Sequence, residues 1–127
     1  MQDKFLFEYA VLRVVPMVER EEFLNVGVIM LCSSQRFLQC TCHFDEDRLK
    51  AFSKDVDIDL VKARLKAFEE ICAGSVAGGP IGLLPLASRF RWLTAARSTI
   101  LQTSAVHPGL CEDAGTTLKR LHTQLVG

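Results

Sequence analysis

The stretch FLNVGVIMLC, residues 23–32, decides the fold. Apolar residues fill it except at two positions, a pattern typical of a strand that is covered on both faces. The polar residues 19–22 before it and 33–36 after it are expected to be exposed connections. We therefore expect residues 23–32 to form a central β-strand with a sheet around it.

Two further strands are predicted next to this one. Residues 5–15 are rich in Phe, Tyr and Val and stop at Pro16, which has no amide hydrogen to continue a ladder. Residues 37–44 alternate between apolar and polar side chains, so one face of that strand belongs to the core. Because the link at residues 33–36 is short, the second and third strands should form an antiparallel hairpin, which the first strand joins as a meander.

Two main helices are expected to cover the sheet. Asp57 or Asp59 can cap a helix that runs through Cys72, with apolar residues at spacings of three and four and Gly74 available to end it. Residues 112–126 have the pattern of a closing helix. Shorter elements are predicted as helices at 46–52 and 86–95, a fourth strand at 99–103, and a flexible loop at 74–85, where four glycines and two prolines gather. The expected fold is α+β: a single small domain over residues 1–127, with an antiparallel sheet of about four strands.

Composition restricts the classes of function. Fifteen basic residues balance fifteen acidic ones, so net charge does not favour binding to nucleic acid or to an anionic membrane. The longest apolar run, residues 26–32, is too short to cross a bilayer, so no membrane role is expected. The five cysteines are odd in number and mostly lie in apolar runs, which favours reduced thiols and a cytoplasmic location.

Charge is unevenly distributed along the chain, because residues 71–111 contain no Asp or Glu. Arginine guanidinium groups bind phosphate or carboxylate oxygens in pairs, hydroxyl groups add donors, and an aromatic ring can stack on a base or a cation. We list as candidate anion ligands Arg89, Arg91, Arg97, Ser98, Thr99 and His107, and as a candidate stacking residue Trp92. The alternative is that these arginines pair with the acidic residues at 19–22 or 45–47, and that the tryptophan fills the core.

The central strand has a polar residue, Asn25, and a glycine, Gly27, inside it. If buried, Asn25 needs hydrogen-bond partners, and Gly27 indicates a bulge or the close approach of another backbone. A functional Asn25 is one possibility. We favour a structural role in which it fastens the loop at residues 16–22.

No catalytic or metal-binding motif stands out. The pattern of Cys40, Cys42 and His43 places the two thiols on one face of a strand and the imidazole on the other, which disfavours zinc. A nucleophile at Cys111 with His107 as its base has the right residue types but no third orienting group. The glycine-rich residues 74–79 are not followed by the Lys-Ser or Lys-Thr pair of a phosphate-binding loop. We therefore expect no catalytic residue, no metal and no cofactor.

Several segments together resemble a known family. They are YAVLRVVP at 9–16, EFLNVGV at 22–28, FD with RL at 44–49, and RFRWLT with RST at 89–99. The chain resembles a bacterial family catalogued as domain of unknown function 3037. The resemblance implies a gene next to that of a kinase of the HipA toxin type, and hence a small regulatory or antitoxin-like partner of that kinase. The resemblance identifies no catalytic residue in this sequence.

Two functions follow as hypotheses. The first is a non-enzymatic module that binds a protein partner such as a kinase, through residues 89–99 or the acidic loop at 19–22. The second is a small domain that binds a phosphate or nucleotide, conceivably an enzyme, with the arginines holding the anion. A third hypothesis, binding of single-stranded nucleic acid, has less support than either, because only one aromatic side chain lies among the charges.

Overall fold

The sheet has five strands, all paired antiparallel. The computed structural model describes residues 4–97 and 99–127, apart from the side chain of Val18. Its strands are β1 (Phe5–Val14), β2 (Leu24–Cys32), β3 (Phe37–Cys42), β4 (Leu101–Thr103) and β5 (His107–Cys111). The first three form the meander that the sequence predicts, in the order β3, β2, β1. The α+β fold class is thereby confirmed.

Strand β1 is the centre of the sheet. It pairs with β2 along one side, while β4 and β5 share its other side at different heights. The expectation of about four strands missed β5, because Pro108 and Gly109 argue against a strand. In the structure, Pro108 and Gly109 nevertheless lie in a strand, because β5 pairs with the N-terminal half of β1. A glycine is needed at position 109, since a Cβ atom there would lie 2.4 Å from the Phe7 ring.

A β-bulge interrupts the pairing of β1 with β2. The register shifts so that Leu12 pairs with Gly27 and the next residue, Arg13, pairs with Asn25. A Cβ atom built on Gly27 would lie 2.1 Å from the carbonyl oxygen of Thr41 on β3. The bulge and the close backbone approach predicted for Gly27 are therefore both present.

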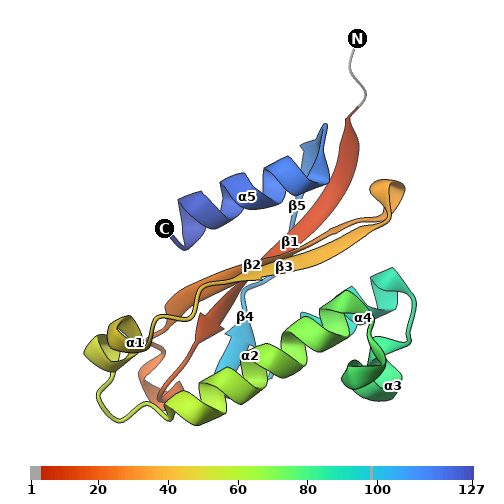
Figure 1. Ribbon diagram of the computed structural model, residues 1–127. Coiled ribbons are helices and arrows are strands. Elements are labelled where there is room, and N and C mark those ends of the chain that lie inside the picture. The colour runs from red at the N-terminus through yellow and green to blue at the C-terminus, as the bar shows by residue number, and fades with distance from the viewer. Residues whose placement is uncertain (1–3, 98) are drawn as a thin grey trace.

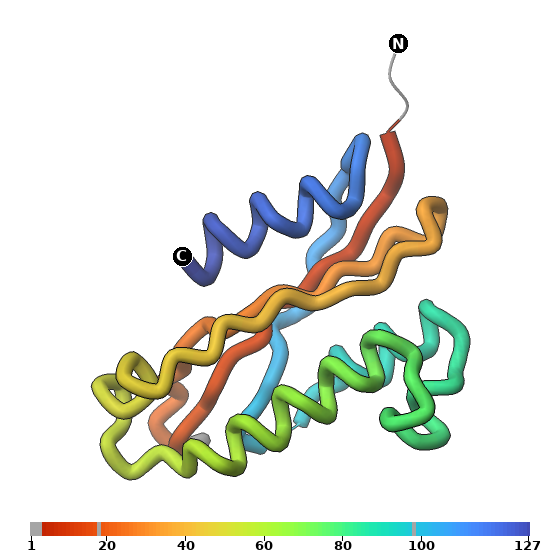
Figure 2. Tube along the Cα trace, in the orientation of Figure 1, coloured from red at the N-terminus to blue at the C-terminus, as the bar shows by residue number. Residues whose placement is uncertain are grey.

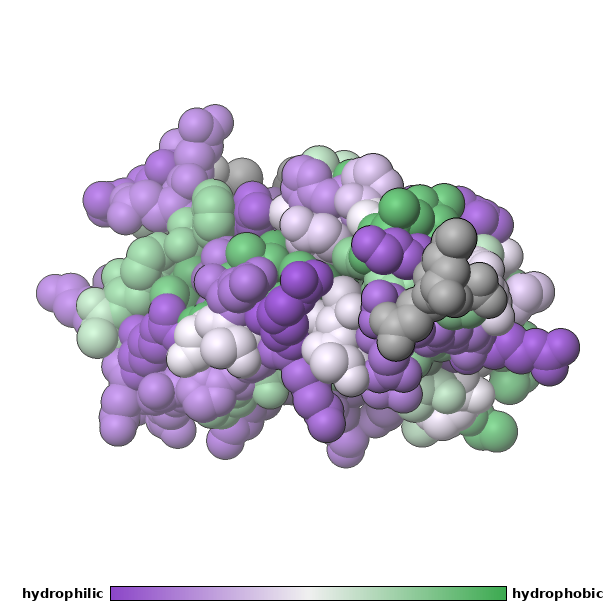
Figure 3. All heavy atoms as spheres, turned by 90° about the horizontal axis from the view of Figure 1, so that it is seen from above, coloured by the Kyte–Doolittle hydropathy of each residue, from purple (hydrophilic) through white to green (hydrophobic). Residues whose placement is uncertain are grey.

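Helices cover both faces of the sheet, as Figures 1 and 2 show. Helix α5 (Ala114–Leu125) lies on one face, while α2 (Ile58–Ala73) and α4 (Leu86–Leu93) lie on the other. A core forms on each side. Ile29 and Leu31 of β2 face α2 and α4, whereas Val28 and Met30 face α5. The outward side of α5, seen from above in Figure 3, is mostly hydrophilic.

Aspartate side chains cap helix starts, among them the Asp57 cap that the sequence predicts. The Asp45 carboxylate accepts a hydrogen bond from the Arg48 amide at the start of α1 (Glu46–Phe52), and Asp57 accepts one from Leu60 at the start of α2. Gly74 ends α2 in the left-handed conformation, with φ of 73°. These local signals explain why the long helices were predictable.

The expectation of a flexible loop at residues 74–85 was wrong. This segment contains a 3₁₀ turn (Val76–Gly78) and the short helix α3 (Gly79–Gly82). Gly82 is buried, and a Cβ atom there would lie 2.6 Å from the Ser75 carbonyl oxygen. Its glycines therefore allow close packing of turns, and Ile81 packs on the core. No helix in the described ranges is long and apolar enough to span a bilayer.

Candidate interaction site around Trp92

Arg89 has a structural position. Its side chain is 9% exposed, and its guanidinium group donates to the carbonyl oxygens of Leu84 at 2.9 Å, Cys72 at 2.8 Å and Ile71 at 3.3 Å. The last two carbonyls belong to the final turn of α2, where the Ile71 carbonyl also accepts from the Gly74 amide at 3.0 Å. Arg89 therefore joins α4 to the end of α2 through its Nε and Nη1 atoms.

Arg91 lies two residues further along α4 but is exposed. The only hydrogen bond of its side chain among the described residues is to the Ser88 hydroxyl oxygen, at 3.4 Å. The structure therefore separates Arg89 from Arg91. Neither of these arginines, nor Arg97, forms an ion pair with a described carboxylate, so the alternative of salt bridges to residues 19–22 or 45–47 is not observed.

Arg97 and Trp92 form one unit. The Cζ atom of Arg97 lies 4.2 Å from the centre of the indole ring, within the range of a cation–π interaction. The guanidinium group also donates to the backbone carbonyls of Trp92 and of Leu93, the latter at 3.3 Å. Burial lowers the pKa of Arg97, but an arginine remains charged at neutral pH. The result is a cation fixed over an aromatic face.

A hollow opens beside this pair. It has a volume of about 120 Å³ and lies between one side of α2 and the chain from Trp92 to β4. Its apolar floor includes Phe68, Ile71 and Leu93, and its polar rim includes Arg64, Arg97 and Thr99. Trp92 is 41% exposed, so it does not fill the core. The hollow combines apolar surface, an aromatic ring and two guanidinium groups.

Sequence reasoning missed Arg64. This residue lies 28 positions before Trp92, within the charged surface of α2, so nothing in its local sequence pointed to a site. The available signal was its spacing of three from Ala67 and of seven from Ile71, which places all three on one side of the helix. Arg64 contributes the second positive charge of the hollow.

The other candidate anion ligands are dispersed. Thr99 lines the hollow, but its hydroxyl group donates to the Leu101 carbonyl oxygen at 2.7 Å. His107 lies on β5, with its ring centre 5.5 Å from that of Tyr9, and Tyr9 packs on the α5 side of the sheet. Ser98 lies outside the described residues. The structure thus brings together Trp92, Arg97 and Thr99 and leaves the other described candidates elsewhere.

Asn25 makes a hydrogen bond that was not foreseen. Its side-chain amide donates to the carbonyl oxygen of Leu125 at 3.1 Å, so it holds the end of α5 and not the loop at residues 16–22. The sequence separation of 100 residues explains why no local pattern revealed this contact.

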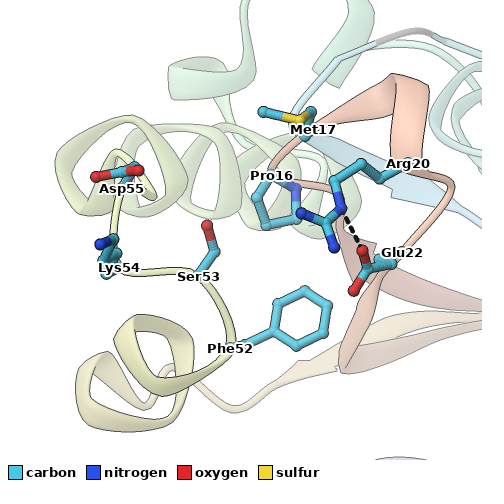
Figure 4. Close-up of a pocket in the computed structure, with 8 residues that line it drawn as sticks. All are labelled: Pro16, Met17, Arg20, Glu22, Phe52, Ser53, Lys54 and Asp55. Carbon is cyan, nitrogen blue, oxygen red and sulfur yellow. Dashed lines mark hydrogen bonds and ion pairs between the residues drawn. The ribbon is translucent and has the colours of Figure 1, made fainter.

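A larger cavity, of about 410 Å³, lies between the β1–β2 and α1–α2 loops (Figure 4). The ion pair between Arg20 and Glu22, at 2.5 Å, lines one side of it, and Lys54 and Asp55 line the other. Because charges of both signs alternate around it, it offers no preference for an anion or a cation. Across the parts of the chain that are described, no group of three or more His, Cys, Asp or Glu side chains is placed to hold a metal ion.

Comparison with known proteins gives one match. The model of a family described as protein of unknown function DUF3037 matches residues 9–126. No curated protein and no solved structure matches the chain. The match includes β1 from Tyr9 onward, strands β2 to β5, helices α1 to α5 and the hollow beside Trp92.

Proposed function

The chain belongs to the DUF3037 family, and we propose that it is a small non-enzymatic module that binds a protein partner through the hollow beside Trp92. The partner suggested by the family resemblance is a kinase of the HipA toxin type. Free thiols at all five cysteines fit a reducing compartment, so the proposal places the complex in the cytoplasm.

The exposed tryptophan carries this proposal. Tryptophan and arginine are enriched among the residues that dominate binding energy at protein interfaces, and here both lie on the rim of one apolar hollow. Arg97 holds the indole ring in a fixed orientation, which lowers the entropy lost when a partner covers it. A partner would cover the apolar floor and the indole ring together.

The surrounding charge defines the chemistry of the partner. Arg64 and Arg97 lie on the rim, and neither forms an ion pair with a carboxylate among the described residues. An apolar or aromatic side chain next to a carboxylate or a phosphorylated residue would match both the floor and the rim. We therefore propose an acidic segment of the partner with at least one large apolar side chain.

The test measures binding to a kinase of the HipA toxin type, the partner that the family resemblance suggests, by calorimetry with purified proteins. We expect Trp92→Ala and Arg97→Ala each to weaken binding about 30-fold, because interface hot spots contribute about 2 kcal/mol or more. Arg91→Ala is the matched control, since Arg91 is exposed on the same helix but does not line the hollow. It should bind as the wild type does.

Equal affinity of Trp92→Ala and the wild type, with both proteins folded, would overturn the proposed contact surface. Trp92 is the only tryptophan in the chain, so its fluorescence gives a second readout. Covering the ring should shift its emission maximum to shorter wavelength.

A phosphorylated small molecule is the second candidate, favoured by the two guanidinium groups of Arg64 and Arg97 on one rim. A ligand at 100 times its dissociation constant adds about 2.7 kcal/mol to stability. A rise in the unfolding midpoint with a nucleotide or sugar phosphate, lost in Arg64→Ala, would favour this function over the first.

A further inference from the structure

The outer edge of β3 is open. This strand is the last one on its side of the sheet, and its other side pairs with β2. The amide of His43 donates to the carbonyl oxygen of Val26 on β2 at 2.7 Å. Because backbone groups of successive residues in a strand point to alternate sides, the amide and carbonyl groups of Leu38, Cys40 and Cys42 point away from β2. Within the described chain no hydrogen bond reaches these outward groups.

The open edge lies between two helices. Figure 1 looks onto it, with α5 on one side and α2 on the other. On the α5 side, the Thr41 hydroxyl is 2.6 Å from Nδ1 of His122, and a Cβ atom at Gly115 would lie 4.0 Å from the Phe37 ring. Helices α5 and α2 both contact β3, one from each face of the sheet.

A groove accompanies this edge on the α2 side. It has a volume of about 290 Å³, with Cys42, Phe44 and Leu65 as its apolar part and Lys62, Lys66 and Glu69 as its charged part. Lys62 lies 5.3 Å from the centre of the Phe44 ring, at the C-terminal end of the strand, and the two lysines outnumber the one glutamate in the lining. An occupant with a carboxylate at that end would find two lysines.

The other edge strands are protected, whereas β3 is not. Natural sheets block edges with prolines, charged residues or very short strands. Strand β4 has three residues, and β5 carries Pro108 opposite Glu8. Residues Phe37–Cys42 of β3 include neither proline nor a charged side chain. The lack of protection at this one edge fits a strand that receives a partner.

We propose that the edge of β3 binds an extended segment of a partner protein, which adds to the sheet as a sixth strand. Main-chain hydrogen bonds to Leu38, Cys40 and Cys42 give affinity, and side chains in the groove give specificity. The segment carries aliphatic side chains toward Cys40 and Cys42 and a carboxylate next to Lys62 and Lys66. This surface lies along a different side of α2 from the Trp92 hollow, so it goes beyond the function proposed above.

The test uses two synthetic peptides with blocked ends, TVTVTET and its reverse TETVTVT, which cover both strand directions. Alternate residues place two valines and one glutamate on the same face. Nuclear magnetic resonance should show binding with a dissociation constant below about 1 mM. The amides of Leu38, Cys40 and Cys42 should exchange with solvent at least about tenfold more slowly in the complex.

Charge reversal tests the groove. Lys62→Glu and Lys66→Glu are exposed substitutions and should each weaken binding about tenfold, while Arg91→Glu, on α4, should leave it unchanged. A peptide methylated on the backbone nitrogens that face β3 should not bind, because it cannot donate to the edge. Absence of binding by both peptides at 5 mM, roughly five times the expected limit, would overturn the proposal. Slower exchange found only at amides outside β3 would overturn it as well.

Discussion

Arg89 and Arg91 are two residues apart on α4, yet their environments predict opposite results on substitution. Removing the Arg89 side chain leaves the carbonyl oxygens of Leu84 and Cys72 without their donor, and leaves that of Ile71 with only the Gly74 amide. Bonds to a charged group contribute about 1.5–3 kcal/mol each and are not additive, so Arg89→Ala should lower the free energy of unfolding by about 3 kcal/mol. Arg91→Ala should change it by less than about 0.5 kcal/mol. Urea unfolding of both variants checks this.

The same pair separates two explanations of the arginines. If Arg89 were an anion ligand, its loss would affect ligand binding more than folding. A wild-type unfolding curve for Arg89→Ala would contradict the structural position described above. Arg89→Lys should recover only part of the stability, because an ammonium group cannot reach three carbonyls with the fixed geometry of a guanidinium group.

Gly27 gives the second prediction at this scale. A methyl group there would lie 2.1 Å from the Thr41 carbonyl oxygen, so β3 must move away from β2. We expect Gly27→Ala to lower stability by about 2–3 kcal/mol. Gly115→Ala is the control, because its Cβ atom would lie 3.6 Å from the nearest atom, an ordinary contact, and alanine favours the helix by up to about 1 kcal/mol. Thermal unfolding that ranks the two variants in the reverse order would contradict the assignment.

At the scale of elements, the docking of α5 on β3 depends on His122. Burial lowers the pKa of His122, and the positive charge of His43 lowers it further. The unfolded chain therefore binds a proton on this residue at a higher pH than the folded chain does. Stability from His122 is complete above the unfolded pKa of about 6.5 and is lost as the pH falls through that value toward the lower folded pKa.

We therefore expect the wild type to lose stability as the pH falls from about 7.5 to about 5, a range that brackets the pKa of an unfolded histidine. The His122→Gln variant should lose less stability over the same range. Urea unfolding at several pH values measures this. The control is His107→Gln, which removes an exposed histidine from β5. An identical pH dependence in His122→Gln and the wild type would show that the His122 imidazole is not responsible.

The elements predicted correctly are those with dense local signals. Strands β1 to β3 have apolar runs or alternation, and α2 has a cap at Asp57 and a terminating Gly74. The errors arise where a local rule is overridden by packing. Pro108 and Gly109 have a low preference for strands. Strand β5 nevertheless forms, because Gly109 leaves room for the Phe7 ring of β1. The glycines at residues 74–85 indicate flexibility in isolation, whereas in the structure they let turns pack closely.

At the scale of the whole molecule, the site was predictable in part. The sequence singled out Trp92 and Arg97 from the absence of carboxylates around them, and the structure places them together. It could not supply Arg64, because α2 and α4 meet only through tertiary packing. Nor could it show that Arg89 donates to backbone carbonyls, since the carbonyls that it binds lie up to 18 residues away in sequence.

The reactivity of the five cysteine thiols measures whether the whole fold is intact. Cys32 and Cys111 are buried in the core under α5, and Cys72 is buried in the core under α2. The adjacent Cys40 thiol and burial raise the pKa of Cys42, and burial together with Cys32 raises the pKa of Cys111. Because only the thiolate attacks an alkylating agent, and because access is limited, the folded chain should react slowly at every position.

Mass spectrometry after treatment with iodoacetamide at pH 8, below the pKa of about 8.5 of a free thiol, should therefore show no adduct on the folded protein and five on the chain in guanidinium chloride. Intermediate denaturant should give molecules with either none or all five, since both cores share the strands β1 and β2 and should be lost together. Adducts at Cys42 alone, without denaturant, would instead show that the groove beside β3 opens independently of the two cores. Such local opening would also lower the affinity of β3 for the added partner strand, because the partner would bind only those molecules in which β3 is in place.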